Sequence, residues 1–424
     1  MLDIKRLRDN EAEVREGLRR KHSNIDVDAI LALDRERRHL LTEVETMKSR
    51  RNTVSKEIGI RKKKGEDVAA VMAEMRELGD TVAALDQQVR EAETELNELW
   101  LTVPNLPHAS VHEGRDSADN KVVRVVGEPR KFDFQPRPHH ELGDMLGLFD
   151  FERATRMTGA GFPLYLGLGA KLERALIQFM LDLHTSEHGY TEMSPPFVVN
   201  SASMTGTGQL PKMKEDMYHM PVDDLWLIPT AEVPVTNYFR DEIVDRPLPI
   251  AFTAYTPCFR REAGAAGRET RGLIRVHQFD KVEMVRFVDP ATSYDELEKL
   301  VGHAEAVLNA LGLHYRVLQL CSGDLSFAAA KCYDIELWAP GHNGWLEVSS
   351  CSNFEDFQAR RAGIRYRNAD GKPTYVHTLN GSGVALARLV VAILENGQQP
   401  DGTVLLPEPI RPYMGGIDRI KPKD

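Results

Sequence analysis

The chain is poor in cysteine and has no long apolar run. Four cysteines occur among 424 residues, and they form neither a CxxC pair nor a metal-binding spacing. No apolar stretch approaches the ~20 residues that a membrane span requires. The segment MLDIKRLRDN lacks the apolar core of a secretion signal. We therefore expect a protein of the cytoplasm, without disulfides and with no membrane partner. The four cysteines are Cys258, Cys321, Cys332 and Cys351.

Positive charge is not in excess either. The formal net charge is -10, so any contact with nucleic acid must come from a local basic patch and not from overall charge. With 42% hydrophobic residues the chain can bury substantial cores, and its length indicates two or three domains.

Apolar residues recur at alternating steps of three and four in two segments, which predicts two helices with facing heptad seams. The turn-like stretch RKKKGED lies between them, so we expect an antiparallel hairpin over about 28–100 with its tip near 60–67. The first seam is Ile30, Leu33, Leu40, Val44, Met47, Val54 and Ile58, with Arg37 and Arg51 in its gaps; the second is Val68, Val71, Met75, Leu78, Val82, Leu85, Val89, Ala92, Leu96 and Leu99.

The two helices differ in charge. Residues 28–64 carry 11 Lys or Arg against 6 Asp or Glu, formally +5, and residues 65–100 carry 2 against 10, formally -8. Opposite charges flanking a seam favour antiparallel pairing. This does not account for Arg61, Lys62, Lys63 and Lys64 at the tip, whose mutual repulsion a phosphate backbone would relieve.

Pro104 and Pro107 end the hairpin and predict a linker, so we divide the chain into residues 1–105 and 106–424. In the second part, an amphipathic helix over about 170–187 and a short strand into Pro195 and Pro196 precede alternating strands and loops. The run LIRVHQFDKVE among them is predicted to be a strand. Helices are predicted at YDELEKLVGHAEAVLNALG and GVALARLVVAILEN. This is an α+β pattern with a mostly antiparallel sheet flanked by helices.

Short motifs occur in a characteristic order in this second part. They are the helix–strand–proline unit, F-R-x-E at Phe259–Glu262, and Gly381, Ser382, Gly383 and Arg388, which are predicted to open a helix. Together they resemble the three motifs of class II aminoacyl-tRNA synthetases. TAEVP, RGLIRVHQFDKVE, WLEVSSCSNFEDFQARR and HTLNGSG narrow the resemblance to bacterial-type seryl-tRNA synthetases, and the hairpin resembles that family's tRNA-binding arm.

The resemblance implies a ligase that activates L-serine with ATP and transfers it to the 3′ end of tRNA(Ser), and also to tRNA(Sec) where the host has one. Such chemistry needs positive charge around the α-phosphate and the attacking carboxylate, a task suited to a planar guanidinium. The family's catalytic residues fall on Arg260, Glu262 and Arg388. Its ATP-binding residues fall on Arg260, Arg261, Glu262, Arg275, Val276, Phe279, Glu347, Val348, Ser349, Ser350 and Arg388.

Other roles follow from the same resemblance. Glu347 and Ser350 would ligate Mg²⁺ as hard oxygen donors. The loop GAAGRETRG, with Arg268 and Arg271, would meet the acceptor end of tRNA, and Arg61, Lys62, Lys63 and Lys64 would bind tRNA at the arm. Serine-binding residues fall on Thr230, Ala231, Glu232, Arg260, Glu283, Asn380 and Ser382; which carboxylate takes the ammonium group stays open.

No catalytic zinc is expected, because the ligands of the zinc-using type of seryl enzyme are not apparent. Pro196 matches the family's proline in motif 1, which implies a homodimer. His277 and Cys351 are interpreted as structural residues.

Two alternatives remain at this stage. A paralogue could activate an amino acid for a carrier protein, although the intact seams and the basic tip argue against it. A non-catalytic coiled-coil protein built on the same fold would not need Arg260, Glu262, Glu347, Ser350 and Arg388 together.

Overall fold

The computed structural model describes residues 1–264 and 271–422. Its contacts divide the chain into two compact units. The helical unit consists of Ile4–Arg19 and Ser23–Pro104, and the sheet unit of Met1–Asp3, Arg20–His22 and Asn105–Asp424. Among the described residues, no helix is both long and apolar enough to cross a membrane.

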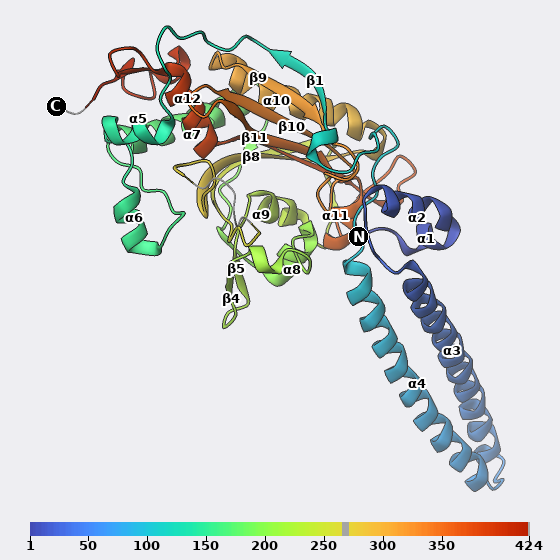
Figure 1. Ribbon diagram of the computed structural model, residues 1–424. Helices are drawn as coiled ribbons and strands as arrows, with labels where there is room; N and C mark the ends of the chain where they lie inside the picture. Colours follow the sequence, from blue (N-terminus) through green and yellow to red (C-terminus); the bar gives the residue numbers. More distant parts are fainter. Residues whose placement is uncertain (265–270, 423–424) are drawn as a thin grey trace. The chain divides into compact units, whose positions relative to one another are not determined.

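Two long antiparallel helices, α3 (Val27–Lys63) and α4 (Ala69–Leu101), dominate the helical unit, and α1 (Ile4–Asp9) and α2 (Glu11–Arg20) precede them (Figure 1). The Asp26 carboxylate begins α3 by accepting a hydrogen bond from the Ala29 N–H, at 3.0 Å. Both predicted seams are confirmed, because every seam position is buried or half-buried and Val44 and Val82 are almost fully covered. The helical hairpin was therefore predictable from apolar spacing alone.

Ion pairs across the hairpin account for its charge split. Arg37 pairs with Glu93 at 3.1 Å, and Lys48 pairs with Asp86 at 2.8 Å. At the tip, Arg61 pairs with Glu57 within its own helix, at 2.5 Å. The ion pairs of the described residues include none at positions 62–64, whose three lysines are exposed. Ion pairs thus explain the opposite charges along α3 and α4, but they do not explain the three lysines at the tip.

The sheet unit is built on eight strands in the order β1-β9-β10-β11-β14-β8-β7-β2. In the described residues the β2–β7 pair is parallel and the other neighbouring strands are antiparallel, which confirms the predicted sheet type. Its strands are β1 (Lys121–Val126), β2 (Thr191–Glu192), β7 (Ile250–Phe259), β8 (Gln278–Val288), β9 (Tyr315–Gln319), β10 (Lys331–Ala339), β11 (Gly344–Asn353) and β14 (His377–Ala385).

Helices and smaller sheets surround this large sheet. The helices are α5 (His139–Leu146), α6 (Phe151–Thr158), α7 (Leu168–Ser186), α8 (Ser201–Thr207), α9 (Glu232–Thr236), α10 (Ser293–Ala310), α11 (Phe357–Ala362) and α12 (Leu386–Gly397). The short strands are β3 (Val198–Asn200), β4 (His219–Met220), β5 (Leu225–Leu227), β6 (Ile243–Val244), β12 (Arg365–Arg367), β13 (Pro373–Tyr375), β15 (Val404–Leu405) and β16 (Arg419–Ile420).

The two faces of β8 belong to different cores because side chains alternate along a strand. Val282 and Met284 pack in the larger core with α7, α10 and α12. Val285 and Phe287 pack in a second core with α9 and α11. Figure 1 shows α10 and α9 on opposite faces of the sheet. The odd-numbered side chains of β8 therefore share one face, which lies in the second core at residues 285 and 287 and extends along the strand to residue 279.

Three predicted boundaries need correction. The run LIRVHQFDKVE is strand only from Gln278, because Leu273–His277 contains turns and bends. The strand after α7 has only two residues, Thr191 and Glu192. Gly381, Ser382 and Gly383 do not open a helix; they lie in β14, and α12 begins at Leu386. The hydrogen-bonded ladder to β8 keeps this glycine-rich segment extended.

Phe287→Ala should destabilise the sheet unit by about 3–5 kcal/mol, since the side chain is fully buried and its removal leaves a cavity. Thermal unfolding of this variant and of Met157→Ala would check the expectation. Met157 is 71% exposed and its change should cost less than about 0.5 kcal/mol. Equal losses of melting temperature in the two variants would contradict the two-core description.

Candidate active site

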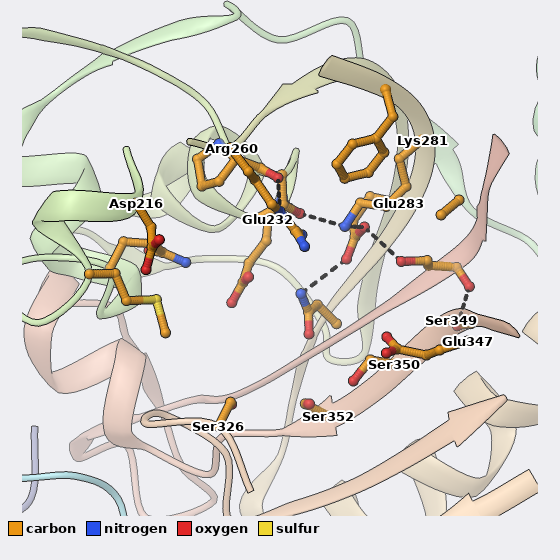
Figure 2. A pocket seen from close by; sticks show the side chains of 18 of the residues that line it. Asp216, Glu232, Arg260, Lys281, Glu283, Ser326, Glu347, Ser349, Ser350 and Ser352 are labelled. Carbon is orange, nitrogen blue, oxygen red and sulfur yellow. Dashed lines mark hydrogen bonds and ion pairs between the residues drawn. The ribbon is translucent and has the colours of Figure 1, made fainter. Parts of the chain in front are cut away.

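A cavity of about 640 Å³ opens on the sheet unit where β8, β11 and β14 lie side by side. Figure 2 shows Arg260 and Glu232 on one side of this cavity and Glu347, Ser350 and Ser352 on another. Its size suits a small-molecule site, for which about 300–1,000 Å³ is typical. The cavity brings together the predicted residues Thr230, Glu232, Arg260, Glu262, Arg275, Val276, Phe279, Glu283, Glu347, Val348, Ser349, Ser350, Asn380, Ser382 and Arg388.

A buried ion pair lies at the centre of the cavity. Lys281 and Glu283 are two residues apart on β8, so they point to the same face and form a salt bridge. Lys281 also donates to the Thr230 hydroxyl at 2.9 Å. The Glu283 carboxylate accepts hydrogen bonds from Asn380 at 3.0 Å and Ser382 at 3.4 Å (Figure 2). Both charges are thus surrounded by polar partners although the lysine and the glutamate are almost fully buried.

Glu232 is the second carboxylate of the cavity and has a different environment. It is 7% exposed and accepts a hydrogen bond from the Gln358 amide at 2.6 Å. Burial, and after it the charge of nearby Glu283, raises the pKa of Glu232 to about 7. The Glu232 carboxyl group therefore keeps its proton at pH values well above the one at which an exposed glutamate ionises.

Three arginines reach the cavity from three segments. The Arg260 guanidinium lies 5.1 Å from the centre of the Phe279 ring, and its Nε donates to the Pro229 carbonyl at 3.4 Å. Arg275 forms an ion pair with Glu262. On α12, Arg388 donates to the Ile274 carbonyl at 3.1 Å and to the Glu347 carbonyl at 2.7 Å. The guanidinium groups are held by backbone carbonyls or by a single carboxylate, and each retains N–H donors for an anionic ligand.

Oxygen donors gather where β10 and β11 pair. Asp334 lies opposite Ser350, and burial, followed by the charge of Glu347, raises the pKa of Asp334 well above its ordinary value. The Ser350 hydroxyl lies 3.1 Å from the Cys332 sulfur, and Glu347 is about half exposed toward Arg388, at 3.8 Å. Two carboxyl groups and a hydroxyl are hard donors of the kind that Mg²⁺ prefers. The residues present thus fit a magnesium ion that would also be bound by phosphate oxygens.

Some predicted residues do not line the cavity. Ala231 is fully buried in the second core. Arg261 turns toward the Glu215 carbonyl, at 3.0 Å, and Arg271 is exposed on the surface. Arg268 and Gly267 lie outside the described residues. Arg61, Lys62, Lys63 and Lys64 belong to the helical unit.

Sequence reasoning missed three residues of the site. Lys281 could have been found, because it stands midway between Phe279 and Glu283 in the alternation of β8. Gln358 lies on α11 within a quoted motif, but nothing in its spacing indicates a contact with Glu232. Asp216 lines the cavity and accepts a hydrogen bond from the Ala263 N–H at 3.1 Å, and no pattern in the sequence singles it out.

His277 and Cys351, which we interpreted as structural residues from the sequence, have contacts and burial that fit this interpretation. His277 is hydrogen-bonded to the Arg260 carbonyl at 2.9 Å. Cys351 is fully buried, and burial raises the pKa of its thiol to about 12, so the reactive thiolate does not form near neutral pH. All four cysteines are free.

Comparisons with known proteins cover the whole chain. Residues 1–107 match the model of the seryl-tRNA synthetase N-terminal domain, and residues 218–397 match that of the tRNA synthetase class II core domain (G, H, P, S and T). A serine–tRNA ligase of Carboxydothermus hydrogenoformans is 58% identical over the full length of both chains. One from Pelotomaculum thermopropionicum is 57% identical over 99% of this chain and all of its own. The seryl-tRNA synthetase of Pyrococcus horikoshii, solved with ATP, has a TM-score of 0.93 at 38% identity, with both chains fully covered.

Glu232→Gln should raise the melting temperature at pH 8, because the buried carboxylate is costly when ionised. The folded-state pKa of about 7 lies above the unfolded value near 4.5, so the wild type loses stability as pH rises from about 4.5 to 7, by roughly 3 kcal/mol. The gain of the variant should therefore vanish at pH 4.5. Glu152→Gln, at an exposed position, is the matched control and should show no such difference. A gain that is equal at both pH values would contradict the burial argument.

Proposed function

Since the chain belongs to the seryl-tRNA synthetase family, we propose that it is a serine–tRNA ligase, which activates L-serine with ATP to seryl-adenylate and transfers serine to the 3′ end of tRNA(Ser). The observation that carries the proposal is one cavity that combines two buried carboxylates with three arginines. Carboxylates suit an ammonium group, and arginines suit phosphates and a carboxylate. ATP and an amino acid together present these groups.

Activation requires an oxygen of the serine carboxylate to attack the α-phosphorus of ATP while the bond to pyrophosphate breaks. Arg260 binds the α-phosphate and the attacking carboxylate, so that the two anions approach despite their repulsion. This arginine leaves the ring of Phe279 for the purpose, and the exposed ring then stacks on adenine. Arg388 covers the other face of adenine and binds the outer phosphates with Arg275, while Glu262 accepts from the adenine amino group.

Glu347 and Ser350 would hold a magnesium ion against the phosphates, where it would supply charge neutralisation. Both residues are on β11, so the strand orients their oxygen atoms. Asp334 lies opposite Ser350 on the paired strand β10. Transfer then breaks the bond between the seryl carbonyl and AMP as the terminal hydroxyl of tRNA attacks.

Recognition of serine rests on Thr230, Glu232, Glu283, Asn380 and Ser382. The two carboxylates accept from the serine ammonium and hydroxyl groups, and Lys281 limits the negative charge between them. Alanine would leave buried polar groups without a partner, so it should be rejected strongly. Threonine differs from serine by one methyl group and must be excluded by the cavity wall, which is the weaker discrimination.

The remaining partners follow from the same proposal. The helical hairpin of residues 1–105 binds tRNA through Arg61 and the three tip lysines, and residues 106–424 carry out aminoacylation. Arg268 and Arg271 contact the acceptor end. The substrate tRNAs include tRNA(Sec) where the host has it, and the enzyme acts in the cytoplasm as a homodimer. The free, buried cysteines fit such a reducing compartment.

The purified protein should catalyse serine-dependent ATP–pyrophosphate exchange and charge tRNA(Ser), with little exchange on alanine or threonine. Arg260→Ala should lose exchange without unfolding, because its guanidinium acts on the reacting groups. Measuring exchange and charging in the same sample separates the alternatives. Exchange without charging would favour a carrier-protein paralogue, and a protein active in neither assay would overturn the ligase proposal.

The triple variant Lys62→Ala, Lys63→Ala and Lys64→Ala should bind tRNA less tightly and with a weaker salt dependence. Loss of up to three phosphate contacts should lower the slope of log K against log salt by about 2. Pyrophosphate exchange should be unchanged. Removal of three exposed lysines from the sheet unit, Lys121, Lys131 and Lys372, is the matched control. An equal loss of tRNA affinity in the control would remove the tip from the binding surface.

A further inference from the structure

The strand β14 is irregular immediately after its last cavity residue. It pairs one-to-one with β8 from His377 opposite Val288 to Ser382 opposite Glu283. The next pair is Ala385 with Lys281, so Gly383 and Val384 together lie opposite the single residue Val282. This extra residue is a β-bulge, which frees backbone groups from the ladder.

Two side chains of α7 bind the freed backbone groups. The His184 Nε2 lies 3.0 Å from the Gly383 carbonyl oxygen, and the Val384 N–H donates to the Met180 sulfur at 3.0 Å. Met180 and His184 are four residues apart, so they share one face of the helix. His184 is fully buried, as is Val384, and water does not replace these bonds. The bulge is therefore held from α7.

The fit between His184 and the bulge is close. A Cβ atom on Gly383 would lie 2.3 Å from the His184 Nε2, which is shorter than any ordinary contact. Only glycine leaves room for the imidazole at this position. Gly383, the second glycine of the G-S-G motif, is therefore required by the close approach of His184 from α7.

The hydrogen bonds determine the tautomer of His184. A carbonyl oxygen only accepts, so the His184 Nε2 must carry the proton. Burial lowers the pKa of His184 to about 4, and the ring is neutral at pH 7, which makes its Nδ1 an acceptor. The neighbouring His188 Nδ1, at 2.9 Å, is then the donor. The His188 ring stacks on His303 with centroids 4.2 Å apart, which fixes its orientation.

Ser382 stands directly before the bulge and takes part in the cavity. Its hydroxyl donates to Glu283, and its carbonyl accepts from the Ser349 hydroxyl at 2.6 Å. Asn380 lies two residues earlier on the same face and donates to the same carboxylate. A shift of the bulge would move both donors relative to Glu283. Of the ATP-binding arginines, Arg260 and Arg275 lie on other segments. Arg388 follows the bulge on α12, but it is held separately by the Ile274 and Glu347 carbonyls.

We propose that His184 is a positioning residue for the amino-acid subsite: by donating to the Gly383 carbonyl it fixes the β14 bulge, and with it the Ser382 and Asn380 side chains that orient Glu283. This inference rests on the proposed function, since it assigns the residue to the serine part of that site. The residue touches no substrate.

The test compares three substitutions of His184 by exchange kinetics at varied serine and varied ATP. His184→Phe keeps a ring but has no donor, and His184→Asn has a donor that is too short to reach the carbonyl. Both should raise the KM for serine about tenfold and leave the KM for ATP within about twofold. His184→Gln carries an N–H near the position of Nε2 and should restore the KM for serine.

Leu176→Ala, two turns earlier on α7 and equally buried, is the control for destabilisation of the helix. It should lower the melting temperature without changing the KM for serine. A wild-type KM for serine in folded His184→Phe would overturn the inference, as would an equal increase in Leu176→Ala. Should the phenylalanine variant not fold, equal KM values in the Asn and Gln variants would overturn it. Failure of the proposed function would instead show in the wild-type protein, as exchange that serine does not stimulate.

Discussion

The buried ion pair between Lys281 and Glu283 is the interaction on which the candidate active site depends. Removing one partner of such a pair typically costs about 3–5 kcal/mol, because the remaining charge has left water without compensation. The site also contains Glu232, and the same lysine acts on this second carboxylate: burial raises the pKa of Glu232, and the charge of Lys281 opposes the rise. Thr230, Asn380 and Ser382 complete the arrangement from two other segments. The two carboxylates can thus bind an ammonium group, while the lysine and the polar neighbours keep their buried charge from destabilising the fold.

The same strand serves two purposes through the alternation of its side chains. Even-numbered residues of β8 pack under α7, α10 and α12, and the odd-numbered face passes from the second core into the cavity. Charged residues at 281 and 283 are therefore supported by apolar packing on the opposite face. Rigid support of this kind is what a site needs when it must hold its groups at fixed distances before the substrate binds.

Much of this organisation could be predicted from the sequence, and the omissions have physical reasons. The helical hairpin follows from apolar spacing. Most of the ATP- and serine-binding residues that the family resemblance implied line one cavity, and Ala231 and Arg261 do not. Lys281 was overlooked although strand alternation places it beside Glu283. Gln358 and His184 could not be predicted, since each contacts a residue more than 100 positions away and no local pattern encodes the contact. The strand character of Gly381–Gly383 was likewise missed, because glycines suggest a helix start or a turn when the neighbouring strand is unknown.

The β14 bulge also bears on how this segment tolerates changes of length. Deleting one residue at Gly383 or Val384 would restore a regular ladder with β8. Ala385 would stay opposite Lys281, so the strand would keep the same side chains on each face beyond the deletion. The Met180 and His184 side chains would nevertheless lose the backbone groups that they bind, and both of those side chains are fully buried. A shorter segment would thus pair better with β8 but would no longer be attached to α7.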